Sequence, residues 1–214
     1  MPAAPDPTPT GPNGQSALLW DMAGTLIPYD PVTGRPGALP GCAEFLPELG
    51  RDFRMFVTTG DTAAGARGLL RDHELLRHFE AIYGDLFGPV GKPYGAILRQ
   101  VGAAPRRSLA IGDRLRADIP GDTDELVTIL INQDGEIINA GMIGFLISRL
   151  RRRDAEFPAA FDAMLADGEP APAAEGECQG GAVVRAVTTH DGFDIKLRLF
   201  RHPALAGDRR LIFI

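Results

Sequence analysis

Acidic and hydroxyl side chains follow several short apolar runs of this sequence, together with one of its two lysines. Asp21, Thr58, Thr59 and Asp113 come at the ends of such runs, and Asp118 lies five residues after Asp113. Lys92 lies at the start of a helical pattern. Carboxylate oxygens are the ligands that hard cations such as Mg²⁺ prefer, whereas hydroxyl, ammonium and backbone N–H groups bind phosphate oxygens. A carboxylate beside such a metal can also attack phosphorus as a nucleophile. These residue types therefore favour phosphoryl chemistry at a magnesium site, provided that the fold brings them together.

The elements that must position these residues alternate along the chain. Short apolar runs closed by Gly, Asp, Asn or Thr predict strands at residues 17–20, 54–58, 81–83, 108–112 and 126–131. Helical patterns lie at residues 42–49, 61–71, 93–101, 140–152 and 157–166. We expect Pro47 to shorten or kink the first helix and Asp61 to cap the second. This alternation predicts an α/β Rossmann-like parallel sheet with helices on both faces, which binds ligands beyond the carboxyl ends of its strands.

Composition divides the chain into four parts. Residues 1–15 are rich in proline and glycine and are predicted to be a disordered tail, and residues 16–166 form the α/β domain. Residues 167–181 are a linker by content, and residues 182–214 are predicted to be a small antiparallel β-hairpin module with its turn at 191–192. We expect this module to pack on the main domain or on a second subunit, which would give a homo-oligomer.

Charge and composition exclude several functional classes. The formal net charge of -6 gives no broad attraction to nucleic acid or to an anionic membrane. No apolar run approaches the roughly 18 residues that span a bilayer, and the N-terminus lacks the basic start and apolar core of a secretory signal. Cys42 and Cys178 lie far apart, without the spacing of a zinc site or a disulfide framework. We therefore expect a cytoplasmic protein without nucleic-acid or membrane partners.

Four segments resemble, in order and spacing, the four motifs of the haloacid dehalogenase-like (HAD) superfamily. The stretch "DMAGT" (residues 21–25) resembles D-x-D-x-T of motif I, and "VTTGD" (residues 57–61) resembles motif II. Lys92 matches motif III, and "GDRLRAD" (residues 112–118) matches G-D-x-x-x-x-D of motif IV. The resemblance covers about residues 15–135 and implies the same Rossmann-like fold.

The resemblance also implies a role for each matching residue. Asp21 would be the nucleophile that accepts the phosphoryl group, and Thr59 and Lys92 would be further catalytic residues. The residues expected to bind Mg²⁺ are Asp21, Ala23 through its backbone carbonyl, Asp113 and Asp118. The residues expected to bind the phosphorylated substrate are Met22, Thr58, Thr59, Gly60 and Lys92.

Ala23 departs from the family pattern, because position 23 normally carries a second aspartate. In family phosphatases that aspartate protonates the leaving oxygen and then deprotonates the attacking water. General acid–base help of this kind is typically worth about 10²–10⁴-fold in rate. Two groups could substitute for it: Tyr29 and Asp30, which follow Asp21 closely in the loop, and Asp61, which lies next to motif II. The alternative is that all three are solvated loop or cap residues.

The segment after Asp118 is a second departure, because few residues separate it from the next predicted strand. The final strand–helix unit therefore looks truncated relative to the family. Asp122, Asp124 and Glu125 are expected to lie in a solvated loop near the rim of the sheet.

Phosphonoacetaldehyde hydrolases resemble this chain in having D-x-A-G-T, but they rely on a Schiff-base lysine in a cap. No lysine lies between Asp21 and Lys92 here, and about 30 residues separate motifs I and II, too few for a sizeable cap. The sequence therefore favours a capless, Mg²⁺-dependent HAD-like phosphatase that is slow or restricted to activated substrates. The alternative is a catalytically impaired HAD-fold module for binding, regulation or assembly.

Overall fold

A computed structural model describes residues 15–30, 32–86, 91–131, 139–153, 156–167, 169–170, 183–188, 194–202 and 209–214. Within these residues one nine-stranded sheet has the strand order β3-β2-β1-β4-β5-β9-β8-β7-β6. Its strands are β1 (Ala17–Trp20), β2 (Arg54–Thr58), β3 (Ala81–Tyr83), β4 (Leu109–Gly112), β5 (Val127–Leu130), β6 (Glu169–Pro170), β7 (Val183–Thr188), β8 (Asp194–His202) and β9 (Arg209–Phe213). The run from β3 to β9 in this order is parallel throughout. The predicted α/β Rossmann-like fold is therefore confirmed.

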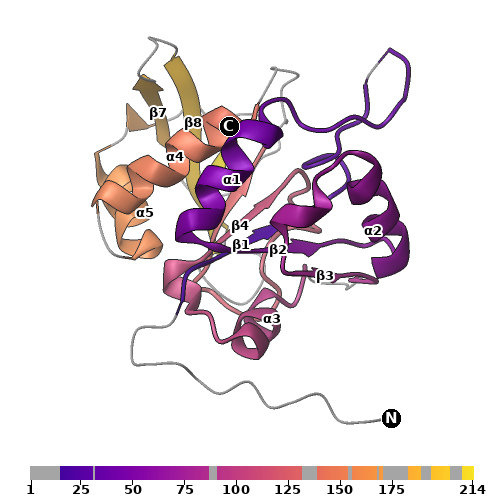
Figure 1. Ribbon diagram of the computed structural model, residues 1–214. Coiled ribbons are helices and arrows are strands. Elements are labelled where there is room, and N and C mark those ends of the chain that lie inside the picture. The colour runs from indigo at the N-terminus through magenta and orange to yellow at the C-terminus, as the bar shows by residue number, and fades with distance from the viewer. Residues whose placement is uncertain are drawn as a thin grey trace.

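Helices cover both faces of the sheet. They are α1 (Cys42–Asp52), α2 (Ala63–Asp72), α3 (Tyr94–Val101), α4 (Ala140–Arg153) and α5 (Phe157–Ala166), with short 3₁₀ turns η1 (Leu76–His78) and η2 (Pro105–Arg107). In Figure 1, α1, α4 and α5 lie on one side of the sheet and α3 lies on the other. Side chains of a strand alternate between the faces, so Leu18 and Trp20 join the larger core, whereas Leu19 packs with Tyr94 and Leu98 of α3.

Two helix ends differ from the expectation. Helix α1 continues through Pro47 to Asp52, because Leu46 and Leu49 are buried and their packing outweighs the roughly 3 kcal/mol that an interior proline costs. Helix α2 is capped by Thr62 and not by Asp61, since the backbone N–H of Gly65 donates to Thr62 Oγ1 at 3.1 Å. Both differences leave the strand ends in their expected places.

The C-terminal strands pair antiparallel with one another and join the main sheet through β9. Strand β9 pairs parallel with β5, whereas β8 pairs antiparallel with β9, and β7 with β8. Leu211 and Ile212 of β9 are fully buried, which suits a strand in the middle of a sheet and not one in a small appendage. Asp162 of α5 accepts hydrogen bonds from Arg201 of β8 at 2.8 Å and from Arg210 of β9 at 3.1 Å, which ties these strands to the helix layer.

Several sequence expectations fall on residues outside the described ranges. These are nearly all of the predicted tail, most of the linker, Cys178 and the turn at 191–192. The domain boundaries and the homo-oligomer stay predictions. No helix in the described residues combines the length and the hydropathy that a bilayer crossing requires.

The substitution Leu46→Ala should destabilise the fold, because Leu46 is fully buried between α1 and the sheet core. We expect the free energy of unfolding to fall by about 2–5 kcal/mol in urea titrations. Glu48→Ala, at an exposed position of the same helix, is the control and should change it by less than about 0.5 kcal/mol. Equal effects of the two substitutions would contradict the packing described here.

Candidate active site

The candidate site lies beyond the carboxyl ends of the parallel strands. Asp21 directly follows β1, and its backbone N–H donates to the carbonyl of Ile111 in β4 at 2.8 Å. This bond extends the pairing of β1 and β4 by one residue and fixes the direction in which the Asp21 side chain leaves the sheet. Asp21 as a whole is 6% exposed, so its carboxylate lies below the surface of the rim and not in open solvent.

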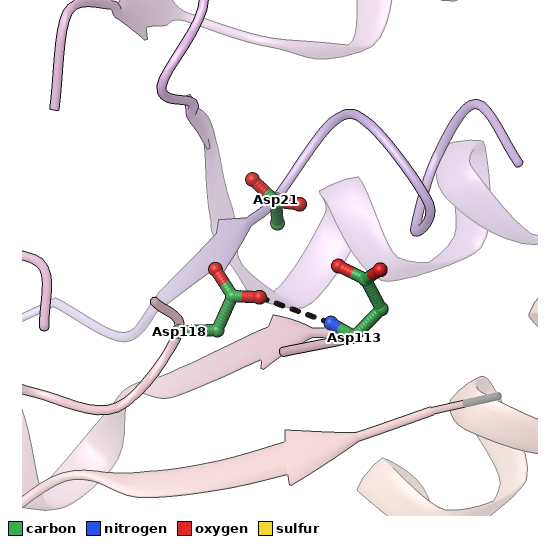
Figure 2. Close-up of side chains that lie close together, drawn as sticks. All are labelled: Asp21, Asp113 and Asp118. Carbon is green, nitrogen blue, oxygen red and sulfur yellow. Dashed lines mark hydrogen bonds between the residues drawn. The ribbon is translucent and has the colours of Figure 1, made fainter. Parts of the chain in front are cut away.

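Three carboxylates meet at this point. Asp21, Asp113 and Asp118 each offer one oxygen, and these oxygens all lie within 4.8 Å of one another. Figure 2 shows the three side chains facing one another above the ends of β1 and β4. Asp118 Oδ2 accepts the backbone N–H groups of Asp113 at 3.1 Å and of Arg114 at 2.9 Å, which folds the loop after β4 back on itself. The five-residue spacing of the two aspartates therefore serves to close this loop.

Lys92 connects the carboxylates at the centre of the site. Its Nζ donates to Asp21 Oδ1 at 2.5 Å, to Asp118 Oδ1 at 2.6 Å and to the backbone carbonyl of Thr58 at 2.8 Å. An ammonium group has three protons to donate, and these three acceptors use all of them. Lys92 is 3% exposed, so the predicted motif III lysine is a buried charge fixed by strand ends and not a surface residue.

The carboxylates repel one another in the absence of a cation. Burial, followed by the charge of Asp118, raises the pKa of Asp21 to about 7, although Lys92 acts in the opposite direction. Burial and the charge of Asp118 also raise the pKa of Asp113. A hard divalent cation would relieve this repulsion, and three carboxylate oxygens are a donor set that suits Mg²⁺. The residues present therefore fit the metal that the sequence predicted.

The turn after Asp21 has its own steric requirement. Gly24 has φ of 83°, and a Cβ at this position would lie 2.2 Å from Asp113 Oδ2. Only glycine allows the turn to approach the carboxylate this closely. Met22 is buried in the larger core at 2% exposure, so its backbone and not its side chain is the part that could face a ligand. Ala23 lies in the same turn and is half-buried.

The two threonines at the end of β2 are not equivalent. Thr58 is fully buried, and its hydroxyl donates to the backbone carbonyl of Trp20 at 3.2 Å. Thr59 Oγ1 instead accepts the backbone N–H of Asp61 at 3.1 Å, and a hydroxyl that accepts still has a proton to donate. Thr59 is therefore better suited than Thr58 to bind a phosphoryl oxygen through its side chain. Gly60, the third expected contact of this segment, follows it directly and is half-buried.

Asp30 is unsuited to replace the acid that position 23 lacks. Its carboxylate accepts the N–H groups of Val32 at 2.9 Å and Thr33 at 2.6 Å and the Thr33 hydroxyl at 2.9 Å. These bonds lower the pKa of Asp30, so the group stays ionised and holds its own turn together. Tyr29 is 55% exposed and Asp61 is also exposed. The structure therefore offers no buried acid among these three candidates.

Two residues near the site were not predicted to belong to it. Tyr94 is fully buried, and its pKa is raised by burial and by the charges of Asp118 and Asp21. Asp122 is exposed, as expected of a solvated loop, and it also accepts the backbone N–H groups of Gly95 and Ala96, each at 2.7 Å. One signal in the sequence pointed to this bond: the helix after Lys92 begins without a Ser, Thr, Asp or Asn of its own to cap it.

One solved structure, a relative of low sequence identity, agrees with this fold, and two others are similar over part of it. A HAD-superfamily hydrolase from Ehrlichia chaffeensis has a TM-score of 0.50 and 14% identity, over 66% of this chain and 100% of its own. A HAD family hydrolase from Deinococcus radiodurans R1, with bound phosphate and sodium, has a TM-score of 0.40 and 16% identity, over 64% and 88%. A haloacid dehalogenase-like family protein from Streptococcus pneumoniae has a TM-score of 0.36 and 19% identity, over 45% and 47%. The chain thus spans about half of this last relative.

The sequence itself matches a family model for haloacid dehalogenase-like hydrolases over residues 29–121. This range contains Thr59, Lys92, Asp113 and Asp118 and begins after Asp21. No curated protein sequence matches the chain. The family match over residues 29–121 and the fold agree with the resemblance of the four motifs to the haloacid dehalogenase-like superfamily.

Proposed function

We propose that this protein is a Mg²⁺-dependent phosphatase that acts on phosphorylated substrates through Asp21. The observation that carries the proposal is the buried Lys92 ammonium, which joins Asp21 to Asp118 beside Asp113. Clustered carboxylates with a single ammonium keep a negative charge that a divalent cation can offset. A core that only had to be stable would rarely contain such a cluster, because buried ion pairs contribute little net stability.

The chemical step follows from the position of each group. An Asp21 carboxylate oxygen attacks phosphorus and forms a phosphoaspartate, while the bond from phosphorus to the leaving oxygen breaks. The Lys92 ammonium balances the charge of Asp21 and of the phosphoryl oxygens, and the Thr59 hydroxyl donates to one of them. The backbone N–H groups of Met22 and Gly60 would bind the others. Water then attacks the phosphorus of the phosphoaspartate, the bond from phosphorus to the Asp21 oxygen breaks, and inorganic phosphate leaves while Asp21 returns as a carboxylate.

Mg²⁺ bound by Asp21, Asp113, Asp118 and the Ala23 carbonyl would neutralise charge on the phosphoryl oxygens. Position 23 supplies no proton, and Asp30 is held ionised in its own turn. The leaving oxygen must therefore depart without protonation by these residues. This favours aryl phosphates, acyl phosphates or anhydrides, whose leaving groups need little acid help.

Ala23 also supports a second candidate function. A site that binds metal and phosphate but lacks an acid could serve as a binding, regulatory or assembly module of the same fold. The C-terminal strands would then be its interaction surface. The two candidates differ in whether an activated phosphate ester is turned over.

Turnover of an aryl phosphate with Mg²⁺ tests the first candidate. Wild type should release the phenol, and Asp21→Asn should not, because an amide cannot act as the nucleophile. Asp124→Asn is the control. It removes the charge of an exposed acid in the neighbouring loop and should keep wild-type activity. Equal turnover by wild type and Asp21→Asn would refute the mechanism.

The substitution Ala23→Asp should supply the missing acid. We expect kcat to rise by about 10²-fold or more, and more for an alkyl phosphate than for an aryl phosphate, because the poorer leaving group gains more from protonation. Ala23→Asn is the matched control, since its amide has similar size but cannot exchange a proton at neutral pH. A similar rise in both variants would show that the change acts through packing and not through acid catalysis.

Mg²⁺ binding can be measured without any turnover. Addition of Mg²⁺ at about 100 times its dissociation constant should stabilise wild type by about 2.7 kcal/mol in thermal unfolding. Asp113→Asn should lose most of this stabilisation, because it removes one of the three charged ligands. Asp124→Asn should keep it. Retention of the full effect in Asp113→Asn would place the metal elsewhere.

A further inference from the structure

The loop that follows Asp118 also holds the backbone of Lys92. The Lys92 N–H donates to the carbonyl of Ile119 at 3.1 Å, and the Lys92 carbonyl accepts the N–H of Gly121 at 2.8 Å. Gly91 has φ of 66°, and a Cβ there would lie 2.2 Å from the Ile119 carbonyl oxygen. The two segments are therefore in close backbone contact. A single loop thus supplies Asp118 to the Lys92 ammonium and fixes the Lys92 main chain.

Asp122 adds a third attachment at the end of this loop. Helix α3 begins at Tyr94, and Pro93, at its N-cap position, gives it no side-chain hydrogen bond. The first N–H groups of a helix need acceptors from elsewhere. The Asp122 carboxylate supplies them, with one oxygen 2.7 Å from Gly95 N and the other 2.7 Å from Ala96 N. A negative charge at this end also interacts favourably with the helix dipole.

We propose that Asp122 is a positioning residue for Lys92, a role that rests on the proposed function. Lys92 lies two residues before α3, and the N–H of Tyr94 donates back to the Lys92 carbonyl at 2.9 Å. Asp122 fixes the first turn of α3, and that turn fixes the point from which the Lys92 side chain starts. The ammonium must reach Asp21, Asp118 and the Thr58 carbonyl together. Asp122 itself touches none of these reacting groups in the described contacts.

The expected loss of rate follows from the short distances between Lys92 Nζ and its acceptors. The three acceptors of Lys92 lie 2.5–2.8 Å from its Nζ. Without the Asp122 cap the first turn of α3 frays, and the lysine spends less time within reach of Asp21. A misplacement of about 1 Å can cost about 10²-fold in rate. Substrate binding through Thr59 and the metal is left in place, so the loss falls on kcat more than on KM.

Kinetics of three variants test this role with an aryl phosphate and saturating Mg²⁺. Asp122→Ala should lower kcat by about 10- to 100-fold with little change in KM. Asp122→Asn keeps one of the two accepting oxygens and should lower kcat less than Asp122→Ala, since its amide nitrogen cannot accept the second N–H. Asn139→Ala removes a cap of α4, where Met142 N donates to Asn139 Oδ1 at 3.0 Å, and should not lower kcat. An equal loss in Asp122→Ala and Asn139→Ala would overturn the proposal.

A chemical measurement tests the same role without turnover. Lys92 and Lys196 are the only lysines, so acetic anhydride labelling followed by mass spectrometry reports on Lys92, with Lys196 as a reference in the same molecule. Lys92 is 3% exposed and should label slowly in wild type and in Asn139→Ala. Asp122→Ala should raise its labelling several-fold relative to Lys196, and Asp122→Asn, which keeps one accepting oxygen, should raise it less.

The two measurements separate failure of the inference from failure of the proposed function. Absence of phosphatase activity in wild type, with Lys92 labelling raised in Asp122→Ala, would reject the enzyme and keep the positioning role. Unchanged Lys92 labelling in Asp122→Ala would overturn the positioning role even if the enzyme is active.

Discussion

The site depends on the hydrogen bonds that the buried Lys92 ammonium donates. A charge removed from water needs close partners, and leaving one of them unpaired is strongly destabilising. The partners come from three places in the sequence: Asp21 after β1, the Thr58 carbonyl at the end of β2, and Asp118 after β4. The sheet must therefore bring these three segments together. The register of the parallel strands thus decides whether the buried Lys92 charge has all of its partners.

Much of this arrangement could be predicted from the sequence. Strands buried on both faces read as short continuous apolar runs, and β1, β2 and β3 have the expected limits. The proximity of Asp21, Lys92, Asp113 and Asp118 was also predictable, because the carboxyl ends of parallel strands share one edge of a sheet. Glycines in the motifs also indicate where the backbone must pack closely against another residue. A Cβ on Gly112 would lie 2.3 Å from Asp118 Cβ, so this glycine and this aspartate require each other.

Other features could not be predicted because they depend on contacts between distant segments. The apolar run of β9 has the same appearance whether it pairs parallel or antiparallel, and only its neighbour β5 decides between the two. Asp122 lies 27 residues from the helix amide that it accepts, and its local sequence is typical of a solvated loop. Thr62 and Asp61 are both good capping residues, and the geometry of the turn selects the threonine.

The position of β9 has a consequence for the order in which the molecule assembles. Strand β5 ends at Leu130, and the partner that covers its outer edge begins only at Arg209. Until that partner is synthesised and docked, the growing sheet has an apolar, unpaired edge next to the strands that form the site. Contacts between such distant segments close large loops and form slowly. Nascent chains of this protein should therefore pass through a stage in which most of the site is already present while the edge of the sheet is open to chaperones or to another copy.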